Sequence, residues 1–525
     1  MKEERITASD NKRLAKNTVF LYARTLLVMA ITLFTSRVIL SSLGFEDYGT
    51  YNVIGGFVAM FSLVSGTLVR ATQRFINVEL GKNKESDPNK IFCTSFYIHC
   101  LLALILVALL ETVGLWYINT KMNLPEGRGF AANVTFQCSA LAFLFHIICM
   151  PYHAVIIAFE RMKAFAYITL LSAVLKLVIS YSLYLSGGDR LVLYSSLILL
   201  EAVLLSFIYY AYCRIHFPIT TKLRFVREKA SYIKQMSFAS YTFIGSIASV
   251  FATQGVNLII NLFSGVTVNA ARGLAVQVQN AVTKFVTDFT TALNPQITKS
   301  YASGDKQTSI KLAYRGAKYS YFLMMIMAIP IIFKTPFILG MWLNKFPEYT
   351  IIFVRLTLMY SLVTVLSHTL TTLILATGDI KVNALMIGGL RLLILPFCYL
   401  VLKLGFEPYS VYYVLIIIDT ISLFTRLYIV KYITHIKLLG YIKDVLIPVI
   451  IVSVIVVLFN YFISNYYNDD VLGVAIYCSL SFIISCLVIL SFGMTQKERV
   501  STLHYVSQKI NKQRSSNENR NSNIS

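Results

Sequence analysis

The sequence predicts an all-α, polytopic membrane protein with about fourteen transmembrane helices. Three observations predict this class: apolar residues make up 56% of the 525-residue chain, charged residues make up 14%, and long apolar segments recur from end to end. Soluble domains carry roughly 25% charged residues, and an apolar excess of this size in water would leave large exposed patches. A lipid bilayer is therefore the solvent that suits the chain.

Fourteen segments are long and apolar enough to cross the hydrocarbon core of a membrane, which takes roughly 17–25 residues. The predicted spans cover residues 18–40, 48–69, 91–118, 131–159, 164–185, 191–213, 233–263, 268–293, 319–341, 351–376, 382–402, 411–430, 445–462 and 471–492. The first apolar stretch is longer than the roughly 7–15 residues of a signal-peptide core and carries Arg24 and Arg37. We therefore interpret it as a span.

The distribution of Lys and Arg predicts the orientation of these spans. With a cytoplasmic N-terminus, and with Lys234 counted in the cytoplasmic linker and Lys334 in an outer loop, 33 of the 47 basic residues fall in cytoplasmic segments, 6 fall in outer loops and 8 fall within spans. Such an excess of basic residues on one side is typical of the cytoplasmic side. The net charge of +22 is then explained by contact with anionic lipid headgroups, and nucleic acid is not an expected partner. Both termini are predicted to be cytoplasmic.

The first twelve spans form an internal repeat. Spans 7–12 begin about 220 residues after spans 1–6, if span 7 is counted from Ala239. Six is an even number, so both halves keep the same orientation, and such parallel repeats are common in carriers with a substrate site between the halves. The predicted division is an N-terminal lobe (1–213), a cytoplasmic linker (214–235), a C-terminal lobe (236–437), spans 13 and 14 (438–493) and a polar cytoplasmic tail (494–525).

Charged side chains inside the spans are the first candidates for function, because each costs roughly 2.5–3.5 kcal/mol on insertion scales. The embedded cations are Arg24, Arg37, Lys176, Arg272, Lys284, Arg355, Arg391 and Arg426. The embedded anions are Glu111, Glu201, Asp288 and Asp419. The excess of cations suits an anionic ligand.

Spans 7 and 8 each carry a polar face. In span 8 the polar face lies within an arc of roughly 160° at 100° per residue. It consists of Asn269, Arg272, Gln277, Asn280, Lys284 and Asp288, and span 7 adds Gln254, Asn257 and Asn261. Two such faces predict a hydrated cavity, whereas the alternative is interhelical hydrogen bonding that only holds the bundle together. Lys284 and Asp288, four residues apart, are also placed to neutralise each other.

These considerations predict two sets of site residues. The candidate substrate-binding residues are Arg24, Arg272, Lys284, Arg391, Asn257, Asn261, Gln277 and Asn280. The candidate coupling-ion residues are Asp288, Asp419 and Glu201. Arg24 has the alternative of snorkelling to the cytoplasmic headgroups.

The other embedded charges have structural interpretations. Arg37 is expected to bind a loop at the outer end of span 1, and Arg355 and Arg426 are expected to anchor at headgroups. Lys176 and Glu201 are placed to pair between spans 5 and 6.

Motifs for metal, cofactor or enzymatic chemistry do not emerge. The chain has no GxxxxGK[ST] motif for nucleotide binding. His146, Cys149 and His153 share a face of span 4 but lack further ligands, and the eight cysteines form no CxxC. The sequence therefore predicts no metal, no cofactor and no enzyme.

Three stretches resemble a known family. The stretch 36–57, SRVILSSLGFEDYGTYNVIGGF, looks like the opening of Wzx-type polysaccharide flippases, members of the multidrug/oligosaccharidyl-lipid/polysaccharide exporter superfamily. The matching residues are Arg37, Leu43, Gly44, Glu46, Asp47, Tyr48, Gly49 and Tyr51, with a wider spacing between Arg37 and Gly44 than many members have. The stretches 294–305 (NPQITKSYASGD) and 341–350 (MWLNKFPEYT) resemble the second half of the family.

The resemblance implies a V-shaped pair of six-helix lobes in the bacterial inner membrane. It implies flipping of undecaprenyl-diphosphate-linked oligosaccharide repeat units from the cytoplasmic to the periplasmic leaflet, for surface polysaccharides such as O-antigen or exopolysaccharide. A polysaccharide polymerase and chain-length machinery are implied candidate partners beside the membrane lipids. In related lipid II flippases, helices 13 and 14 help to form a groove for the lipid tail, and 445–462 and 471–492 are the analogous segments here.

Two other functions stay open. A drug/cation antiporter of the same superfamily would usually have twelve spans and an acidic cavity. A membrane-embedded polysaccharide polymerase or glycosyltransferase would usually carry a large loop with catalytic acids or histidines. The count of spans and the excess of embedded cations favour the flippase.

Overall fold

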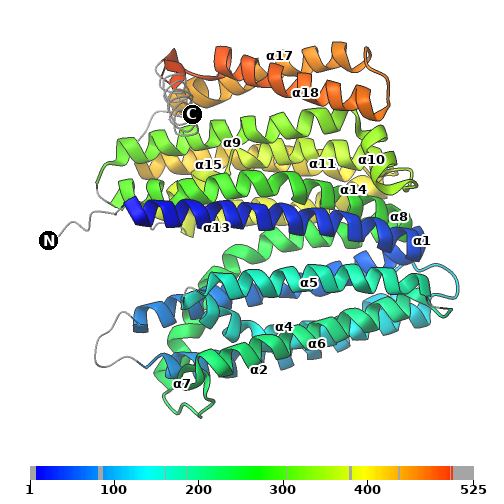
Figure 1. The fold of residues 1–525 in the computed structure, drawn as a ribbon, viewed down its shortest axis with the longest axis vertical. Helices are drawn as coiled ribbons and strands as arrows, with labels where there is room; N and C mark the ends of the chain where they lie inside the picture. The colour runs from blue at the N-terminus through cyan, green and yellow to red at the C-terminus, as the bar shows by residue number, and fades with distance from the viewer. Residues whose placement is uncertain are drawn as a thin grey trace, which may run out of the picture. The chain divides into compact units, whose positions relative to one another are not determined.

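The computed structural model describes residues 8–80, 87–159, 161–185, 187–302, 304–377, 381–434, 438–496 and 498–500. Some side chains within these helices, including those of Arg24 and Asp288, lie outside the described set. The described elements are all helices (Figure 1). Twelve of them are long and apolar enough to cross a membrane, which confirms the predicted all-α, polytopic class.

Glycine kinks account for the difference between twelve helices and fourteen predicted spans. Helices α1 (Ala8–Leu80) and α8 (Lys229–Ala302) each join two helical segments at a glycine with positive φ, Gly44 at 79° and Gly265 at 76°. Glycine adopts this conformation without the steric cost that a Cβ would bring. Division of both helices at their kinks gives the fourteen segments. The kinks are 221 residues apart, which is the offset of the internal repeat.

The chain forms two compact units, and the first comprises residues 1–278, 339–354 and 384–418. Its complete helices are α1, α2 (Pro88–Leu109), η1 (Leu110–Gly114), α3 (Leu115–Thr120), α4 (Gly129–Ala158), α5 (Met162–Ser182), η2 (Leu183–Leu185), α6 (Arg190–His216), α7 (Pro218–Thr221) and α14 (Ile394–Lys403). Helices α4 and α6 pack along each other, with α2 against α4 and α5 against both α1 and α6 (Figure 1). Two apolar clusters, around Phe136 and around Phe92, form the core of these contacts.

The second unit comprises residues 279–338, 355–383 and 419–525. Its complete helices are α9 (Lys306–Phe333), α12 (His368–Thr377), α16 (Leu438–Tyr441), η3 (Ile442–Leu446), α17 (Ile447–Ser464), α18 (Val471–Val488) and η4 (Ile489–Gly493). The remaining helices, divided between the units together with α8, are α10 (Thr335–Leu343), α11 (Thr350–Val365), α13 (Lys381–Leu392) and α15 (Ser410–Thr434). Helix α9 packs against α12, α17 and α18 (Figure 1).

Two buried lysines tie α17 and α18 to α9. At one end, Lys334 donates to Asp469 Oδ1 at 2.7 Å and to the carbonyls of Ser464 at 2.8 Å and Tyr467 at 3.0 Å. At the other end, Lys318 donates to Glu498 Oε2 at 2.9 Å. A buried ammonium is stable only with such partners. Spans 13 and 14 are thus an integral part of the second unit.

Aspartate side chains begin four of the long helices. Asp87, Asp189, Asp305 and Asp470 each accept a hydrogen bond from a backbone N–H in the first turn of the helix that follows. These bonds satisfy donors that have no partner within the helix. The caps therefore fix where α2, α6, α9 and α18 start.

Candidate functional site

A buried arginine is the centre of the polar residues in the first unit. Arg272, on α8 after the kink, is 6% exposed. Its guanidinium donates to Asn257 Oδ1 and, at 3.1 Å, to the carbonyl of Thr253, both on α8 before the kink. Asn257 in turn donates to Gln254 Oε1 at 2.8 Å. The predicted polar faces of spans 7 and 8 therefore meet at Arg272.

Helix α1 approaches this cluster closely because glycines and a small polar residue face α8. A Cβ on Gly56 would lie 3.0 Å from Gln254 Oε1, and a Cβ on Gly273 would lie 3.0 Å from the Asn52 side chain. A Cβ on Gly49 would lie 1.9 Å from the carbonyl oxygen of Val266. The two kinked helices thus contact each other through their backbones, next to the kinks.

Several buried polar atoms of the described residues in this region have no hydrogen-bond partner within the protein. Gln277 donates to the Tyr48 hydroxyl at 2.6 Å. Among the described side chains, Arg272 Nε, Asn269 Oδ1 and Gln277 Oε1 are buried atoms without a hydrogen-bond partner. Buried polar atoms are nearly always satisfied in proteins, so these three suit a hydrated site. We call the set Gln254, Asn257, Asn269, Arg272 and Gln277 the α8 polar cluster.

Asn261, also predicted for substrate binding, hydrogen-bonds to the loop before α4. Its amide accepts from the backbone N–H of Asn123 at 3.1 Å and donates to the Asn123 carbonyl at 3.3 Å. The side-chain amide of Asn123 donates hydrogen bonds to the carbonyls of Asn261 and Leu262. The side chain of Asn261 is buried by this contact. It therefore joins α8 to the loop that precedes α4, and both groups of its amide are already engaged.

The other predicted substrate-binding residues are not gathered at the α8 polar cluster. Arg391 lies on α13 in the first unit and is half-buried. Asn280 and Lys284 are exposed residues of the part of α8 that belongs to the second unit. Arg24, predicted for substrate, and Asp288, predicted for a coupling ion, have side chains outside the described set. Their predicted roles stay predictions.

Two predicted carboxylates are buried. Glu201, on α6, accepts from Ser172 at 2.6 Å, and Lys176 of α5 lies 4.0 Å away, which confirms the predicted contact between spans 5 and 6. Asp419 is buried on α15, in the second unit. Their predicted role as sites for a coupling proton or sodium ion stays a prediction.

Two of the structural interpretations can be compared with the structure directly. Arg37 donates to the Met341 carbonyl at 3.3 Å and to Asn344 Oδ1 at 3.1 Å, which confirms its expected loop contact. Arg426 was expected at the headgroups, and that expectation is wrong. Its side chain is 6% exposed, because it lies on the buried face of α15.

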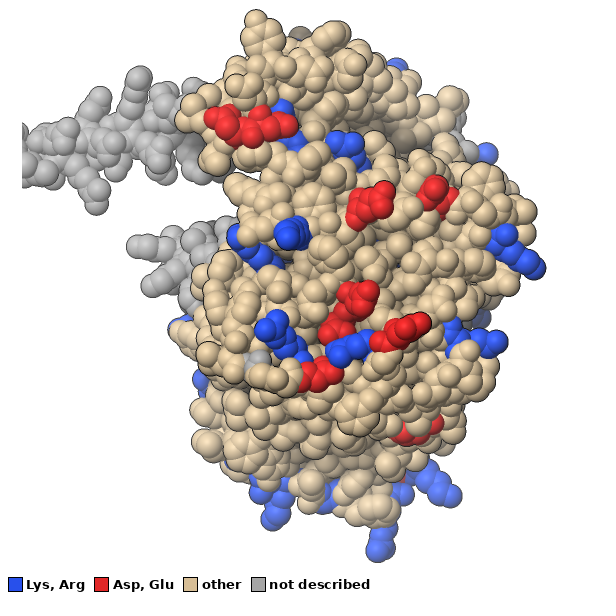
Figure 2. All heavy atoms as spheres, turned by 90° about the vertical axis from the view of Figure 1, so that its right-hand side faces the viewer, with Lys and Arg blue, Asp and Glu red and all other residues tan. Residues whose placement is uncertain are grey.

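Sequence reasoning missed an ion network that joins α1 to the segments just before α4 and α6. Arg128, just before α4, pairs with Asp189 at 2.7 Å and also donates to Asp47 Oδ1 at 2.8 Å. The signal was present, because Asp47 falls in the family-like stretch 36–57. Figure 2 shows one side of the protein, on which acidic and basic side chains lie beside one another. We interpret the network as a clamp that joins α1 to the segments before α4 and α6 in the first unit.

The described residues contain no group of three or more His, Cys, Asp or Glu side chains arranged to hold a metal ion. The rings of His146 and His153 are 6.0 Å apart, and His153 packs on Tyr209 at 3.8 Å between centroids. All eight cysteines are free thiols. The histidines of span 4 are thus packed among aromatic rings.

Solved structures of membrane transporters share this fold. An inward-facing multidrug resistance MATE transporter of the MOP superfamily is 14% identical with a TM-score of 0.67, over 79% of this chain and 98% of that chain. The lipid II flippase MurJ in an inward closed conformation is 13% identical with a TM-score of 0.67, over 90% and 98%. The MATE multidrug transporter DinF-BH, solved as a complex, is 16% identical with a TM-score of 0.59, over 83% and 100%. The chain therefore shares its fold with these transporters.

The sequence identifies the family within this fold. Residues 14–301 match the family described as polysaccharide biosynthesis protein, and the match spans more than half of the chain. The chain belongs to this family, which confirms the resemblance predicted from the sequence. Comparison with curated proteins finds no match.

Proposed function

We propose that the protein flips undecaprenyl-diphosphate-linked oligosaccharide repeat units from the cytoplasmic to the periplasmic leaflet of a bacterial inner membrane by alternating access. Membership of the polysaccharide biosynthesis family and the fold shared with a lipid II flippase support this proposal. The observation that carries it is the buried Arg272 within the α8 polar cluster. An arginine at membrane depth is costly and is usually retained for function.

The residues predicted for substrate binding suit the diphosphate and the sugar of such a cargo. A diphosphate is bound best by guanidinium and ammonium groups, which Arg272, Arg391, Lys284 and Arg24 supply. The amides of Asn257, Gln277 and Asn280 are suitable partners for sugar hydroxyls. The polyprenyl chain need not leave the bilayer. Surface polysaccharide synthesis would then make a polymerase and chain-length machinery the partners at the outer face.

The orientation of the chain follows from its charges. The cytoplasmic placement of both termini is supported by the excess of Lys and Arg in the segments between alternate spans. Basic segments on that side would contact anionic headgroups and would raise the local concentration of an anionic lipid-linked cargo. Glu201, Asp419 and Asp288 are the proposed sites for a coupling proton or sodium ion.

A drug/cation antiporter is the second candidate, favoured by the similarity to two multidrug transporters of the MATE family. The two functions require opposite charges at the binding site. Buried carboxylates would bind a cationic drug, whereas the α8 polar cluster is built on an arginine. Substitution of Arg272 therefore separates the candidates.

The first prediction is that Arg272→Gln lowers flipping at least tenfold, because one charge-assisted contact to a diphosphate is worth about 1.5–3 kcal/mol. The measurement is the translocation of undecaprenyl-diphosphate-linked oligosaccharide in vesicles, together with surface polysaccharide in a flippase-deficient host. Arg214→Gln, an exposed arginine at the end of α6, is the control and should keep full activity.

Full activity of Arg272→Gln at normal expression would overturn the assignment of Arg272. Single neutralisation of Arg24, Lys284 and Arg391 extends the test to the other proposed cations. Export of a cationic dye that survives Arg272→Gln, without translocation of the lipid-linked oligosaccharide by the unsubstituted chain, would favour the antiporter.

A further inference from the structure

The buried guanidinium of Arg272 differs from the two buried lysines of the second unit in the charge of its partners. Each lysine donates to a carboxylate. Arg272 is equally buried, but its hydrogen-bond partners within the described part of the chain are the amide oxygen of Asn257 and the backbone carbonyl of Thr253. Both partners are neutral, so they orient the guanidinium without compensating its charge. A buried charge without a counter-charge is costly, and proteins usually pair it.

The orientation of the Asn257 amide follows from the chemistry of arginine. A guanidinium has donors only, so Asn257 must turn its oxygen towards Arg272 and its NH2 group away. This NH2 group donates to Gln254 Oε1 at 2.8 Å. A Cβ on Gly56 of α1 would lie 3.0 Å from that Oε1 atom and 3.1 Å from Asn257 Nδ2, so the backbone of α1 lies close against both amides. The two amides therefore keep one orientation.

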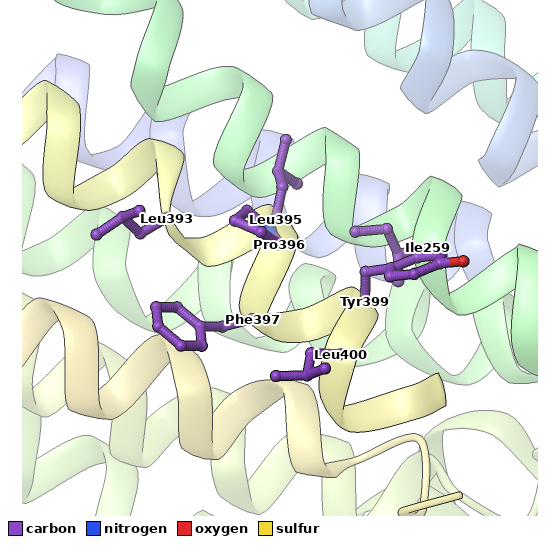
Figure 3. Close-up of a pocket in the computed structure, with 7 residues that line it drawn as sticks. All are labelled: Ile259, Leu393, Leu395, Pro396, Phe397, Tyr399 and Leu400. Carbon is purple, nitrogen blue, oxygen red and sulfur yellow. The ribbon is translucent and has the colours of Figure 1, made fainter. Parts of the chain in front are cut away.

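Helix α14, which also packs on this part of α8, contributes no charge at the contact. A Cβ on Gly255 would lie 2.5 Å from Leu395, so the Leu395 side chain fills the space beside this glycine. Leu395 belongs to the lining of an apolar groove (Figure 3). The other lining residues are uncharged as well, and they are Ile259, Leu393, Pro396, Phe397, Tyr399 and Leu400. At these contacts neither α1 nor α14 brings a carboxylate to the amide pair.

Aspartate in place of Asn257 would fit the same contacts. The two side chains have nearly the same shape, and a carboxylate oxygen would accept from Arg272 as the amide oxygen does. Gln254 would only have to turn its amide over, so that its NH2 group donates to the second carboxylate oxygen. The resulting ion pair would neutralise the guanidinium. Space therefore does not require asparagine at this position, and the choice between the two residues sets the charge of the site.

We propose that Asn257 determines the charge selectivity of the cargo site, because its neutral amide positions Arg272 without cancelling the positive charge. The inference rests on the proposed function and gives Asn257 a role beyond contact with the sugar. Among the described side chains, Arg272 Nε is a buried donor without a partner, and it is free to bind an anionic oxygen. A lipid diphosphate supplies such oxygens, which a guanidinium binds more strongly than it binds hydroxyls.

The test compares two lipids that differ in charge, undecaprenyl diphosphate and undecaprenol, in their binding to the full-length protein in phosphatidylcholine nanodiscs. The unsubstituted protein should bind the diphosphate more tightly. Asn257→Asp should lower this preference about tenfold, because the new carboxylate takes the place of the anion on Arg272, and it should leave the affinity for undecaprenol unchanged. The control is Asn465→Asp, the same change at an exposed residue after α17, which should keep the preference.

A third variant separates the charge of the site from its structure. Asn257→Ala removes the partner of Arg272 but leaves the charge, so this variant should lose thermal stability and keep most of the preference for the diphosphate. Asn257→Asp should keep its thermal midpoint of unfolding and lose the preference. A purely structural role of Asn257 predicts the opposite order, since aspartate preserves the contact and alanine does not.

An unchanged preference in Asn257→Asp, or an equal loss of preference in Asn257→Ala, would overturn the proposal. If Asn257→Asp does not fold, Gln254→Glu takes its place, because it puts a carboxylate on the next residue of the same hydrogen-bond chain and should also lower the preference. Translocation of the lipid-linked oligosaccharide is measured in parallel. Full translocation by Asn257→Asp overturns the charge selectivity and leaves the proposed function intact. Loss of the preference in Asn257→Asp, without translocation by the unsubstituted chain, does the reverse.

Discussion

At the scale of single residues, two asparagines of α8 that look alike in the sequence have different surroundings. Asn261 is buried and exchanges hydrogen bonds with the backbone of Asn123. Asn280 is exposed. The difference arises from the loop before α4, which covers one asparagine and not the other. The position of a residue in the helical repeat predicts which face of the helix it lies on, but not which loop contacts its side chain.

We therefore predict that Asn261→Ala lowers the free energy of unfolding by about 1–3 kcal/mol, because it leaves the N–H and carbonyl of Asn123 without their partners. Asn280→Ala, the same change at an exposed position, should alter it by less than about 0.5 kcal/mol. Thermal unfolding of both variants in detergent micelles measures the difference. Equal midpoints would show that the Asn261 contact contributes nothing to stability.

Helical periodicity allowed us to predict which residues of the candidate site share a face of one helix, but not which residues of other helices they contact. The polar faces of spans 7 and 8 follow from spacing alone, and Arg272 and Asn257 of these faces do meet. The pairing of Tyr48 with Gln277 was not predictable, because it depends on how closely α1 approaches α8. The buried position of Arg426 was missed for a similar reason, since proximity to a span end does not show which face is covered.

At the scale of elements, two long helices each contain a glycine kink at equivalent positions of the repeat. Hydropathy alone predicted separate spans on either side of residues 44 and 265, and the structure keeps the chain helical up to and after each glycine. A hydropathy profile shows where an apolar segment ends. It does not show whether the chain there leaves the helix or only kinks at a glycine with positive φ. The contact of α1 with α8 next to the kinks depends on a second glycine, Gly49.

The Gly49 contact predicts a large difference between two glycines of one helix. Gly49→Ala would bring a Cβ against the backbone of Val266, which cannot rotate away, so α1 and α8 must separate at a cost of about 1–3 kcal/mol or more. Gly55→Ala, with nothing within 4 Å of the new Cβ, should be neutral or stabilising by up to about 1 kcal/mol. The thermal midpoints of unfolding of the two variants measure this difference. A Gly49→Ala variant as stable as the unsubstituted protein would contradict the backbone contact between α1 and α8.

At the scale of the whole chain, the last two spans extend a repeat that is complete without them. Two buried lysines hold them, Lys318 within α9 and Lys334 directly after it. Lys334 binds the turn between α17 and α18, and Lys318 binds Glu498 after α18. Arg315 also pairs with Glu498, at 2.9 Å. Glu498 follows the last candidate span, which ends at Gly493, so its carboxyl is open to titration.

The protonation of the Glu498 carboxyl determines how its ion pair with Lys318 depends on pH. Burial raises the pKa of the carboxyl, but the Thr495 backbone N–H and the Lys318 ammonium outweigh burial and lower the pKa from 4.5 to about 2. Because the folded-state pKa is the lower one, the carboxylate stabilises the fold above pH 4.5, and this contribution is lost as the pH falls towards 2. The tie is thus fully formed at neutral pH.

Glu498→Gln should therefore lower the thermal midpoint at pH 7, because it leaves Lys318 buried with a weaker, uncharged partner. At pH 3 the difference from the unsubstituted protein should be smaller, since part of the stabilisation by the carboxylate is already lost. Glu126→Gln, in the exposed loop before α4, is the control and should have no effect at either pH. A difference that is the same at pH 7 and pH 3 would mean that Glu498 acts through packing and not through its charge.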